Sequence, residues 1–359
     1  MGLTAAAHGE TLRVATWHLE LQRDGPGLFL RDLIKGEVPK VDAAAEILAV
    51  FQPDILLLTS VDWDYDLVAA QALADRFEKS GVDYPYLFAL RPNTGMPTGL
   101  DMDGDGRLGG PRDAQGYGFF PGQGGMLLLS RVPVETALAE DLSGILWTDL
   151  PGALLPIWDG ALFPSPEAIA AQRLSQTGHW VIPVRLSDGT LVTLLAFAAG
   201  TPVFDGLEDR NGRRNHDEVV LWSRWLDGTL DGHMTAPGPV IVLGDANLDP
   251  VDGEGLRIAM RGLLGHERLQ DPEPRSSGGT LAAMSQGGVN TAHEGDPALD
   301  TADWDDAGPG NLRVSYVLPD RSFNVVDAGV VWPAPGEPLA EAAEAAGRHK
   351  LVWVDIAIP

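Results

Sequence analysis

The sequence predicts an α/β fold, a four-layer α/β sandwich in which two packed mixed sheets are flanked by helices. Two observations favour this class. Roughly ten segments have strand patterns and several others have helical spacing, and the two types alternate near the N-terminus. No repeat, low-complexity tract or linker divides the 359 residues. We therefore expect a flexible leader over residues 1–10 and a single domain over residues 11–359.

The N-terminal elements have the clearest patterns. Residues 12–17 mix β-branched, aromatic and apolar side chains and predict the first strand. Residues 42–51 have helical spacing that ends before Pro53, because proline cannot continue a helix. Residues 54–59 are almost continuously apolar, as in a strand covered on both faces. Residues 66–80 follow with helical spacing, with Asp66 as the expected helix N-cap.

The later elements are assigned in the same way, around two irregular stretches at residues 91–125 and 142–166. Further strands are expected at residues 126–129, 180–186, 191–198, 240–243, 312–318, 324–331 and 351–358, and further helices at residues 215–230, 254–264 and 339–346.

Composition excludes several classes of protein. Fifty-one acidic against 25 basic residues leave a formal charge of −26, which argues against tight nucleic-acid binding. No apolar run reaches the ~20 residues of a membrane helix. The absence of cysteine excludes disulfides, thiolate metal sites and a cysteine nucleophile. The chain has no signal-peptide pattern, but Ala5-Ala6-Ala7 resembles the residues beside a cleavage site, so a periplasmic or extracellular location is slightly favoured.

The strongest local motif follows a buried strand. Val240-Ile-Val-Leu-Gly-Asp-Ala-Asn247 ends in a glycine turn that presents Asp245 and Asn247 at a sheet edge. Strand ends of this kind are where α/β proteins place functional sites. Taken alone, the motif is equally consistent with Asp245 starting an ordinary turn.

Four segments in chain order resemble the endonuclease/exonuclease/phosphatase superfamily of metal-dependent phosphoesterases. They are Val14-Ala-Thr-Trp-His18, Pro53-Asp-Ile-Leu-Leu-Leu-Thr-Ser-Val61, Gly244-Asp-Ala-Asn247 and Arg348-His349. A fifth segment, Val314-Ser-Tyr-Val-Leu-Pro319, is similar to a later strand of the family. The resemblance implies hydrolysis of phosphate esters by a divalent cation held by carboxylates, with a histidine stabilising the transition state. The segment of residues 93–130 also resembles an insert of a bacterial subgroup.

Several positions depart from the family pattern. The resemblance implies that Asp245, Asn247 and His349 are retained catalytic residues. His18 stands where the family has Asn, Ser60 replaces a metal-binding Glu, and Ala198 stands near the place of a catalytic His. Ser315 and Arg348 replace two further carboxylates.

These substitutions predict weak or absent binding of catalytic Mg²⁺ or Mn²⁺, because a neutral hydroxyl replaces a strong anionic ligand. Losing an acid/base group costs ~100 to 10,000-fold in rate. We expect Arg348 to pair with Asp245 in place of the ion, or to hold a phosphate together with Asn247 and His349. In the alternative, His18 or a displaced carboxylate (Glu20, Asp62, Asp64 or Asp66) rebuilds a working site.

An acidic loop predicts a second site. Asp101-Met-Asp-Gly-Asp-Gly106 alternates carboxylates and ends in glycine, as Ca²⁺ loops do. We expect Asp101, Asp103, Asp105 and Asp113 to bind a structural Ca²⁺. A solvated acidic turn is the alternative, because no flanking helices are evident.

Two polar segments have simpler expected roles. Residues 205–218 predict a loop of internal salt bridges and a helix cap, although the segment also resembles the border of the subgroup's pocket. His179 with Trp180 predicts core packing rather than a cleft wall.

The leading functional hypothesis is an eroded phosphoesterase, inactive or very weak, that binds a phosphorylated or anionic small molecule or an unknown protein partner. The alternative is an active phosphatase or phosphodiesterase with a remodelled site. A third hypothesis is a scaffold in which the Ca²⁺ loop alone is functional.

Overall fold

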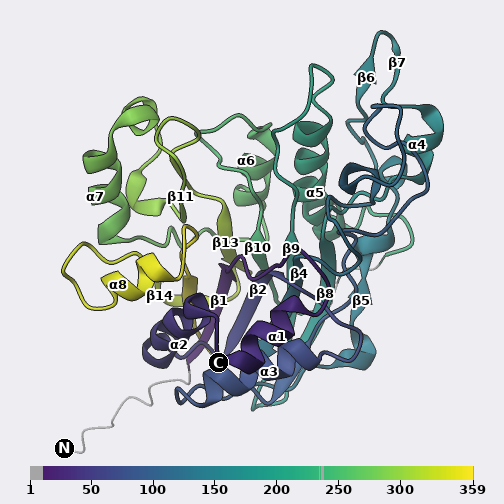
Figure 1. The fold of residues 1–359 in the computed structure, drawn as a ribbon. Coiled ribbons are helices and arrows are strands. Elements are labelled where there is room, and N and C mark those ends of the chain that lie inside the picture. The colour runs from purple at the N-terminus through teal and green to yellow at the C-terminus, as the bar shows by residue number, and fades with distance from the viewer. Residues whose placement is uncertain (1–10, 234, 236–237, 359) are drawn as a thin grey trace, which may run out of the picture.

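Two mixed β-sheets lie face to face at the centre of the molecule, with helices outside them (Figure 1). The computed structural model describes residues 11–358 apart from residues 234, 236 and 237, so the predicted leader lies outside the described residues. In spatial order, the six-stranded sheet is β14 (Asn324–Val330), β15 (Val352–Ala357), β1 (Thr11–His18), β2 (Ile55–Val61), β4 (Gly125–Ser130) and β3 (Tyr86–Phe88). The five-stranded sheet is β13 (Ser315–Pro319), β10 (Val240–Asp245), β9 (Leu191–Ala198), β8 (Gly178–Arg185) and β5 (Glu140–Asp141).

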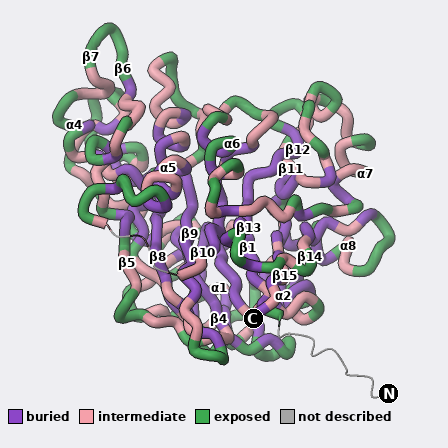
Figure 2. The backbone as a smooth tube through the Cα atoms, turned by 180° about the vertical axis from the view of Figure 1, so that it is seen from behind, coloured by how far each residue is buried: buried purple, intermediate pink, exposed green. Residues whose placement is uncertain are grey.

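Helices cover the outer face of each sheet, which completes the predicted four layers. The six-stranded sheet packs against α1 (Leu28–Lys35), α2 (Pro39–Phe51), α3 (Val68–Glu78) and α8 (Ala340–Ala345). The five-stranded sheet packs against α5 (Arg210–Leu226) and α6 (Ile258–Leu264). Figure 2 shows the buried strands enclosed by exposed loops and helix faces.

The remaining elements are short and lie in the connections. They are α4 (Pro166–Ala171), α7 (Ser277–Gln286), the strand pairs β6 (Ile157–Trp158) with β7 (Ala161–Leu162) and β11 (Ala302–Asp303) with β12 (Asn311–Leu312), and the 3₁₀ helices Pro111–Asp113, Thr136–Leu138, Leu142–Gly144, Trp147–Asp149, Gly288–Ala292 and Pro297–Leu299. No helix among the described residues combines the length and apolar character needed to cross a membrane.

Strand β2 explains why the layers hold together. Side chains alternate across a strand, so Leu56 and Leu58 pack under the helices while Ile55 and Leu57 pack between the sheets. All four are fully buried. Each such side chain contributes ~1.5 to 3 kcal/mol of transfer free energy, so a single strand stabilises two layers at once.

The long irregular stretch of residues 91–125 is held by a buried asparagine. The backbone N–H of Asn93 donates to the carbonyl of Thr177 at 2.9 Å. Its side-chain Nδ2 donates to the carbonyls of Ser143 and Ser175, both at 2.8 Å. These bonds attach the stretch to the start of β8 and to its neighbouring loops, so it is anchored to the sandwich.

Two local predictions are wrong. Helix α5 begins at Arg210, not residue 215, because the polar residues before Asn215 complete its first turn. Asp66 does not cap α3. Asp64 accepts the backbone N–H groups of Val68 and Ala69 at 2.8 and 2.9 Å instead. Helices α1, α4 and α7 were not predicted from the sequence.

Candidate functional site

The candidate site lies where the ends of β1, β2 and β10 meet across the two sheets. His18 ends β1 and Asp245 ends β10, and Nδ1 of His18 lies 2.7 Å from Oδ2 of Asp245. The same nitrogen lies 3.0 Å from Oγ1 of Thr59, its neighbour on β2. The Asp245 side chain is 1% exposed. Oδ1 of Asp245 accepts the backbone N–H of Asn247 at 3.1 Å, whereas the buried Oδ2 that faces His18 has no hydrogen-bond partner among the described residues, so the two side chains approach closely without a hydrogen bond.

Gly244 brings Asp245 into position through a tight backbone contact. Its φ is 146°, and a Cβ added there would lie 1.9 Å from the carbonyl oxygen of Phe197 on β9. No larger residue fits that gap without moving the sheet. The glycine of the signature motif is therefore required for packing between β9 and β10.

The side chains around Asp245 offer little additional chemistry. Ala198 and Ser315 stand opposite Asp245 on the strands at either side. The buried Ser315 Oγ has no hydrogen-bond partner among the described residues. Asn247 adopts a φ of 48°, and its Nδ2 donates to the carbonyl of Ala199 at 2.8 Å. The amide nitrogen therefore holds the loop rather than facing a ligand.

His349 is buried beside His18. The two rings have centroids 4.2 Å apart, and the ring of Trp304 lies edge-on to His349 at 5.1 Å. Nδ1 of His349 has no hydrogen-bond partner in the described part of the chain. Burial, followed by the nearby charges of His18, Arg348 and Lys40, holds the pKa of His349 well below its usual range.

Arg348 does not pair with Asp245 as expected. Its Nε lies 3.3 Å from Oε1 of Glu20, and Nζ of Lys40 lies 3.0 Å from the other oxygen of that carboxylate. Glu20 lies nearer to Arg348 than Asp245 does, because the chain continues from β1 directly into the loop that carries Glu20. The half-exposed guanidinium of Arg348 is therefore directed to Glu20 rather than to Asp245.

Ser60 lies near the end of strand β2, and the acidic residues that follow it accept hydrogen bonds from backbone groups. Ser60 has a φ of 63° and occupies an irregularity in the pairing of β2 with β4. The oxygens of Asp62 accept the backbone N–H groups of Arg23 and Gly124 at 2.9 and 3.0 Å. Burial raises the pKa of Asp62 to about 6. Since Asp64 caps α3, both of these proposed substitute ligands already hold backbone groups.

Two clusters have side chains close enough to share a metal ion. His18, Glu20 and His349 have ligand atoms within 4.8 Å of one another. Asp101, Asp103 and Asp113 form the second such cluster, and Asp105 is not part of it. Asp105 instead accepts the backbone N–H of Arg107 at 2.7 Å. The structure thus brings together three of the four carboxylates of the predicted Ca²⁺ loop.

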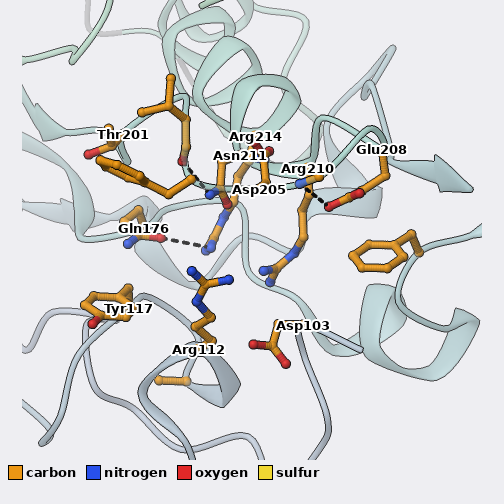
Figure 3. A pocket seen from close by; sticks show the side chains of 15 residues that line it. Asp103, Arg112, Tyr117, Gln176, Thr201, Asp205, Glu208, Arg210, Asn211 and Arg214 are labelled. Atoms are coloured by element: carbon orange, nitrogen blue, oxygen red, sulfur yellow. Dashed lines mark hydrogen bonds between the residues drawn. The ribbon is translucent and has the colours of Figure 1, made fainter. Parts of the chain in front are cut away.

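A cavity of about 870 Å³ opens beside the polar loop of residues 201–214. Its volume lies in the range typical of small-molecule sites. The guanidinium groups of Arg112, Arg210 and Arg214 point into the same space, which Figure 3 shows. Tyr117 and Phe204 lie on its wall.

The arginines of this loop do not form the predicted internal salt bridges. Among the residues that the structure describes, neither Arg210, Arg213 nor Arg214 takes part in an ion pair, whereas His216 contacts Asp217 at 2.9 Å. Their separation from the loop carboxylates follows from α5 starting early, because the helix turns the side chains at 210 and 214 toward the cavity. His179, by contrast, is core as predicted. It is fully buried and bonded to Ser175, and burial lowers its pKa to about 4.

Comparison with known proteins identifies the family of the chain. The profile described as the Endonuclease/Exonuclease/phosphatase family matches residues 31–338. The chain belongs to this family. No curated protein matches the chain.

Solved structures share the fold at low sequence identity. An endonuclease/exonuclease/phosphatase from Beutenbergia cavernae has a TM-score of 0.56 and 18% identity, covering 97% of this chain and 72% of that one. A family protein from Leptotrichia buccalis has a TM-score of 0.52 and 13% identity, covering 97% and 100%. One from Bacteroides vulgatus has a TM-score of 0.50 and 11% identity, covering 98% and 100%.

Family membership gives the His18–Asp245 contact its meaning. The resemblance places a metal ligand at position 18 and a water-positioning carboxylate at position 245. In this member of the endonuclease/exonuclease/phosphatase family, the side chains at the two positions lie in direct contact.

Sequence reasoning missed Thr59 and the cavity arginines, and it named Glu20 only as a displaced carboxylate that could reach a metal. Only the density of basic residues after Asp209 signalled the arginines, and nothing in the sequence linked them to Arg112.

Proposed function

We propose that this protein acts by binding rather than by metal-dependent hydrolysis of phosphate esters. The observation that carries the proposal is the 2.7 Å contact between His18 and the buried Asp245. The ring of His18 lies against the carboxylate that the family pattern assigns to catalysis, at the position where that pattern has an asparagine.

The donor set at the strand ends supports the proposal. Mg²⁺ requires hard oxygen ligands, preferably carboxylates, in near-octahedral geometry. Ser60 offers a neutral hydroxyl and His18 a nitrogen, and the His18 ring lies 2.7 Å from Oδ2 of Asp245. These residues do not fit a magnesium ion. Without the ion, several kcal/mol of charge stabilisation are missing from any phosphoryl-transfer transition state.

The hydrolysis of p-nitrophenyl phosphate and bis-p-nitrophenyl phosphate tests the proposal. We expect the rate with Mg²⁺, Mn²⁺ or Ca²⁺ to equal the rate in EDTA. Turnover that depends on the ion and disappears in Asp245→Ala would contradict it. Arg107→Ala, an exposed change in another loop, controls for general damage.

A remodelled metal site is the second candidate function, and the cluster of His18, Glu20 and His349 favours it. Since Nδ1 of His18 faces Asp245, its Nε2 is left to bind an ion, as in carboxylate–histidine–metal arrangements. A two-His, one-carboxylate set suits Zn²⁺ or Co²⁺. However, Lys40 and Arg348 already neutralise Glu20.

A Co²⁺ titration separates the two candidates. A visible absorption band that saturates near one equivalent and is lost in His18→Ala would establish the remodelled site. Ester hydrolysis by the Co²⁺ form would then replace the binding proposal. The absence of the band would leave the binding role as the better account.

We also propose that the loop of Asp101, Asp103 and Asp113 binds Ca²⁺. Their mutual approach to within 4.8 Å supports it, because like charges at that separation repel unless a cation intervenes. Asp113 is buried while it accepts the backbone N–H groups of Met102 and Gly110. The loop is therefore shaped around its carboxylates.

A further inference from the structure

The cavity beside α5 contains positive groups without partner carboxylates. Within the described chain, no ion pair involves Arg112, Arg210 or Arg214. Nε of Arg210 is buried and has no hydrogen-bond partner there, although its NH2 group donates to Gln172 at 2.6 Å. Burial lowers the pKa of Arg210. Nearby carboxylates raise this pKa, and the positive charge of Arg112 lowers it further.

Arg214 is built rigidly into the wall. It is 5% exposed, and its guanidinium donates to carbonyl oxygens of Leu174, Gln115, Arg173 and Ser175 at 2.6 to 3.0 Å. Burial lowers its pKa to about 9, so it stays charged at neutral pH. Carbonyl oxygens orient a guanidinium without cancelling its charge, which leaves a fixed positive wall.

The carboxylates that line the cavity are engaged by the backbone of their own loops. Asp205 accepts the N–H of Asn211, and Glu208 accepts the N–H of Gly206 at 3.1 Å. Asp103 accepts the N–H of Asp105 at 3.3 Å. These bonds fix the carboxylates in their loops, and the three guanidinium groups face the same space as the carboxylate of Asp103 (Figure 3).

Apolar rings form the remainder of the wall. Tyr117, Phe163 and Phe204 line the cavity, and Phe204 is 76% exposed. A large exposed ring beside a charged pocket provides a surface for an apolar part of a ligand. Arg112 supplies a free forked pair of donors, which matches the peripheral oxygens of a phosphate group, whereas Arg210 and Arg214 use donors on protein oxygens and contribute mainly their charge.

We propose that this cavity binds a phosphate monoester, with its dianionic group between Arg112, Arg210 and Arg214 and an apolar or aromatic group against Tyr117 and Phe204. The proposal rests on the binding role proposed above and names its ligand class. It moves the anion site from the strand ends to the neighbouring loops.

Calorimetric titration of the full chain with phenyl phosphate tests the proposal, with inorganic phosphate and phenyl sulfate as companions. We expect phenyl phosphate to bind most tightly. Inorganic phosphate lacks the ring, and phenyl sulfate has the same shape with one negative charge fewer. Each should bind roughly tenfold more weakly, consistent with the loss of one apolar group or one charge-assisted contact.

Arg112→Ala is the decisive variant, because Arg112 is exposed and its side chain makes no hydrogen bond within the described residues, so its loss leaves the fold intact. We expect it to weaken phenyl phosphate binding about tenfold, and Arg210→Gln to do the same. Arg107→Ala removes the same charge from the same loop, outside the cavity lining, and should change the affinity less than about twofold.

Two results would overturn the proposal. One is the absence of phenyl phosphate binding to the wild-type chain. The other is equal weakening by Arg107→Ala and Arg112→Ala, which indicates a general charge effect. Phosphate release from phenyl phosphate is measured in parallel with Mg²⁺. If phosphate is released while the cavity still binds phenyl phosphate, only the non-hydrolytic role is contradicted. If phenyl phosphate does not bind and no phosphate is released, only the cavity proposal is contradicted.

Discussion

The strand-end centre and the arginine cavity treat charge in opposite ways. At the strand ends, Asp245 contacts His18, and Glu20 contacts both Lys40 and Arg348. In the cavity, Arg112, Arg210 and Arg214 face a common space and form no ion pair within the described part of the chain, although three carboxylates line the same space. A site whose charges are mutually satisfied has little affinity left for an ion or substrate. Unpaired charge held in place by the fold is available for a ligand.

The largest expected effect is on the strand-end centre. His18→Leu leaves the buried carboxylate of Asp245 without the imidazole nitrogen that lies against it, so the free energy of unfolding at pH 7 should fall by about 3 to 5 kcal/mol. Urea denaturation measures it. His233→Leu removes a contact with the exposed Glu140 and should cost less than about 1 kcal/mol. Equal costs in the two variants would show that the Asp245 contact is not a stabilising pair.

A smaller effect is expected for the fixed wall of the cavity. Arg214→Met removes the donors of several buried carbonyl oxygens, so stability should fall by about 2 to 4 kcal/mol. Arg112→Ala should cost less than about 0.5 kcal/mol, because it is exposed. Thermal unfolding of both variants compares them. A costly Arg112→Ala would mean that the cavity arginines are structural and not free for a ligand.

Glu218 gives a pH test of the region that joins the two sites. Its oxygens accept the backbone N–H groups of Gln176 and Gly200, and burial raises its pKa to about 7, against the opposing charge of Arg214. The folded state therefore binds the proton more tightly than the unfolded state, whose pKa is near 4.5. Its contribution to stability is complete below pH 4.5 and is lost as pH rises to 7.

Glu218→Gln removes this titration. The missing acceptor oxygen lowers the stability of the variant by the same amount at every pH. Between pH 4.5 and pH 8, its free energy of unfolding relative to that of wild type should rise by about 1 to 3 kcal/mol. Urea denaturation across that range measures the difference. A difference that stays constant with pH would show that Glu218 titrates normally.

The smallest effect is expected from calcium. At a free Ca²⁺ concentration tenfold above the dissociation constant, binding stabilises the fold by about 1.4 kcal/mol. The midpoint of thermal unfolding should then rise by roughly 3 °C relative to EDTA. Asp103→Asn should abolish the rise, whereas Asp105→Asn, outside the three-carboxylate cluster, should retain most of it. An unchanged midpoint in EDTA would contradict the calcium proposal.

The sandwich was predictable because its signals are local. Residues 55–58 are apolar without a break, which fits a strand covered on both faces, and Gly244 and Asp245 follow such a strand directly. The start of α5 was misplaced because polar residues at its first turn have no apolar period to detect.

The site was less predictable because its contacts join distant segments. The sequence shows that Arg348 is positive, but not whether Glu20 or Asp245 lies nearer to it. Similarly, Arg112 meets Arg210 and Arg214 only because the stretch of residues 91–125 folds back beside α5. Such pairings depend on loop paths, which side-chain type and spacing do not encode.

Gly244 has a consequence for how ancestry is inferred from motifs. Since a methyl group there collides with the neighbouring strand, selection for a folded chain alone retains the glycine, whatever has happened to the chemistry beside it. A signature can in this way outlast the reaction for which it is named. Part of its persistence in a lineage then records steric necessity, and activity has to be inferred from the residues that packing leaves free to drift.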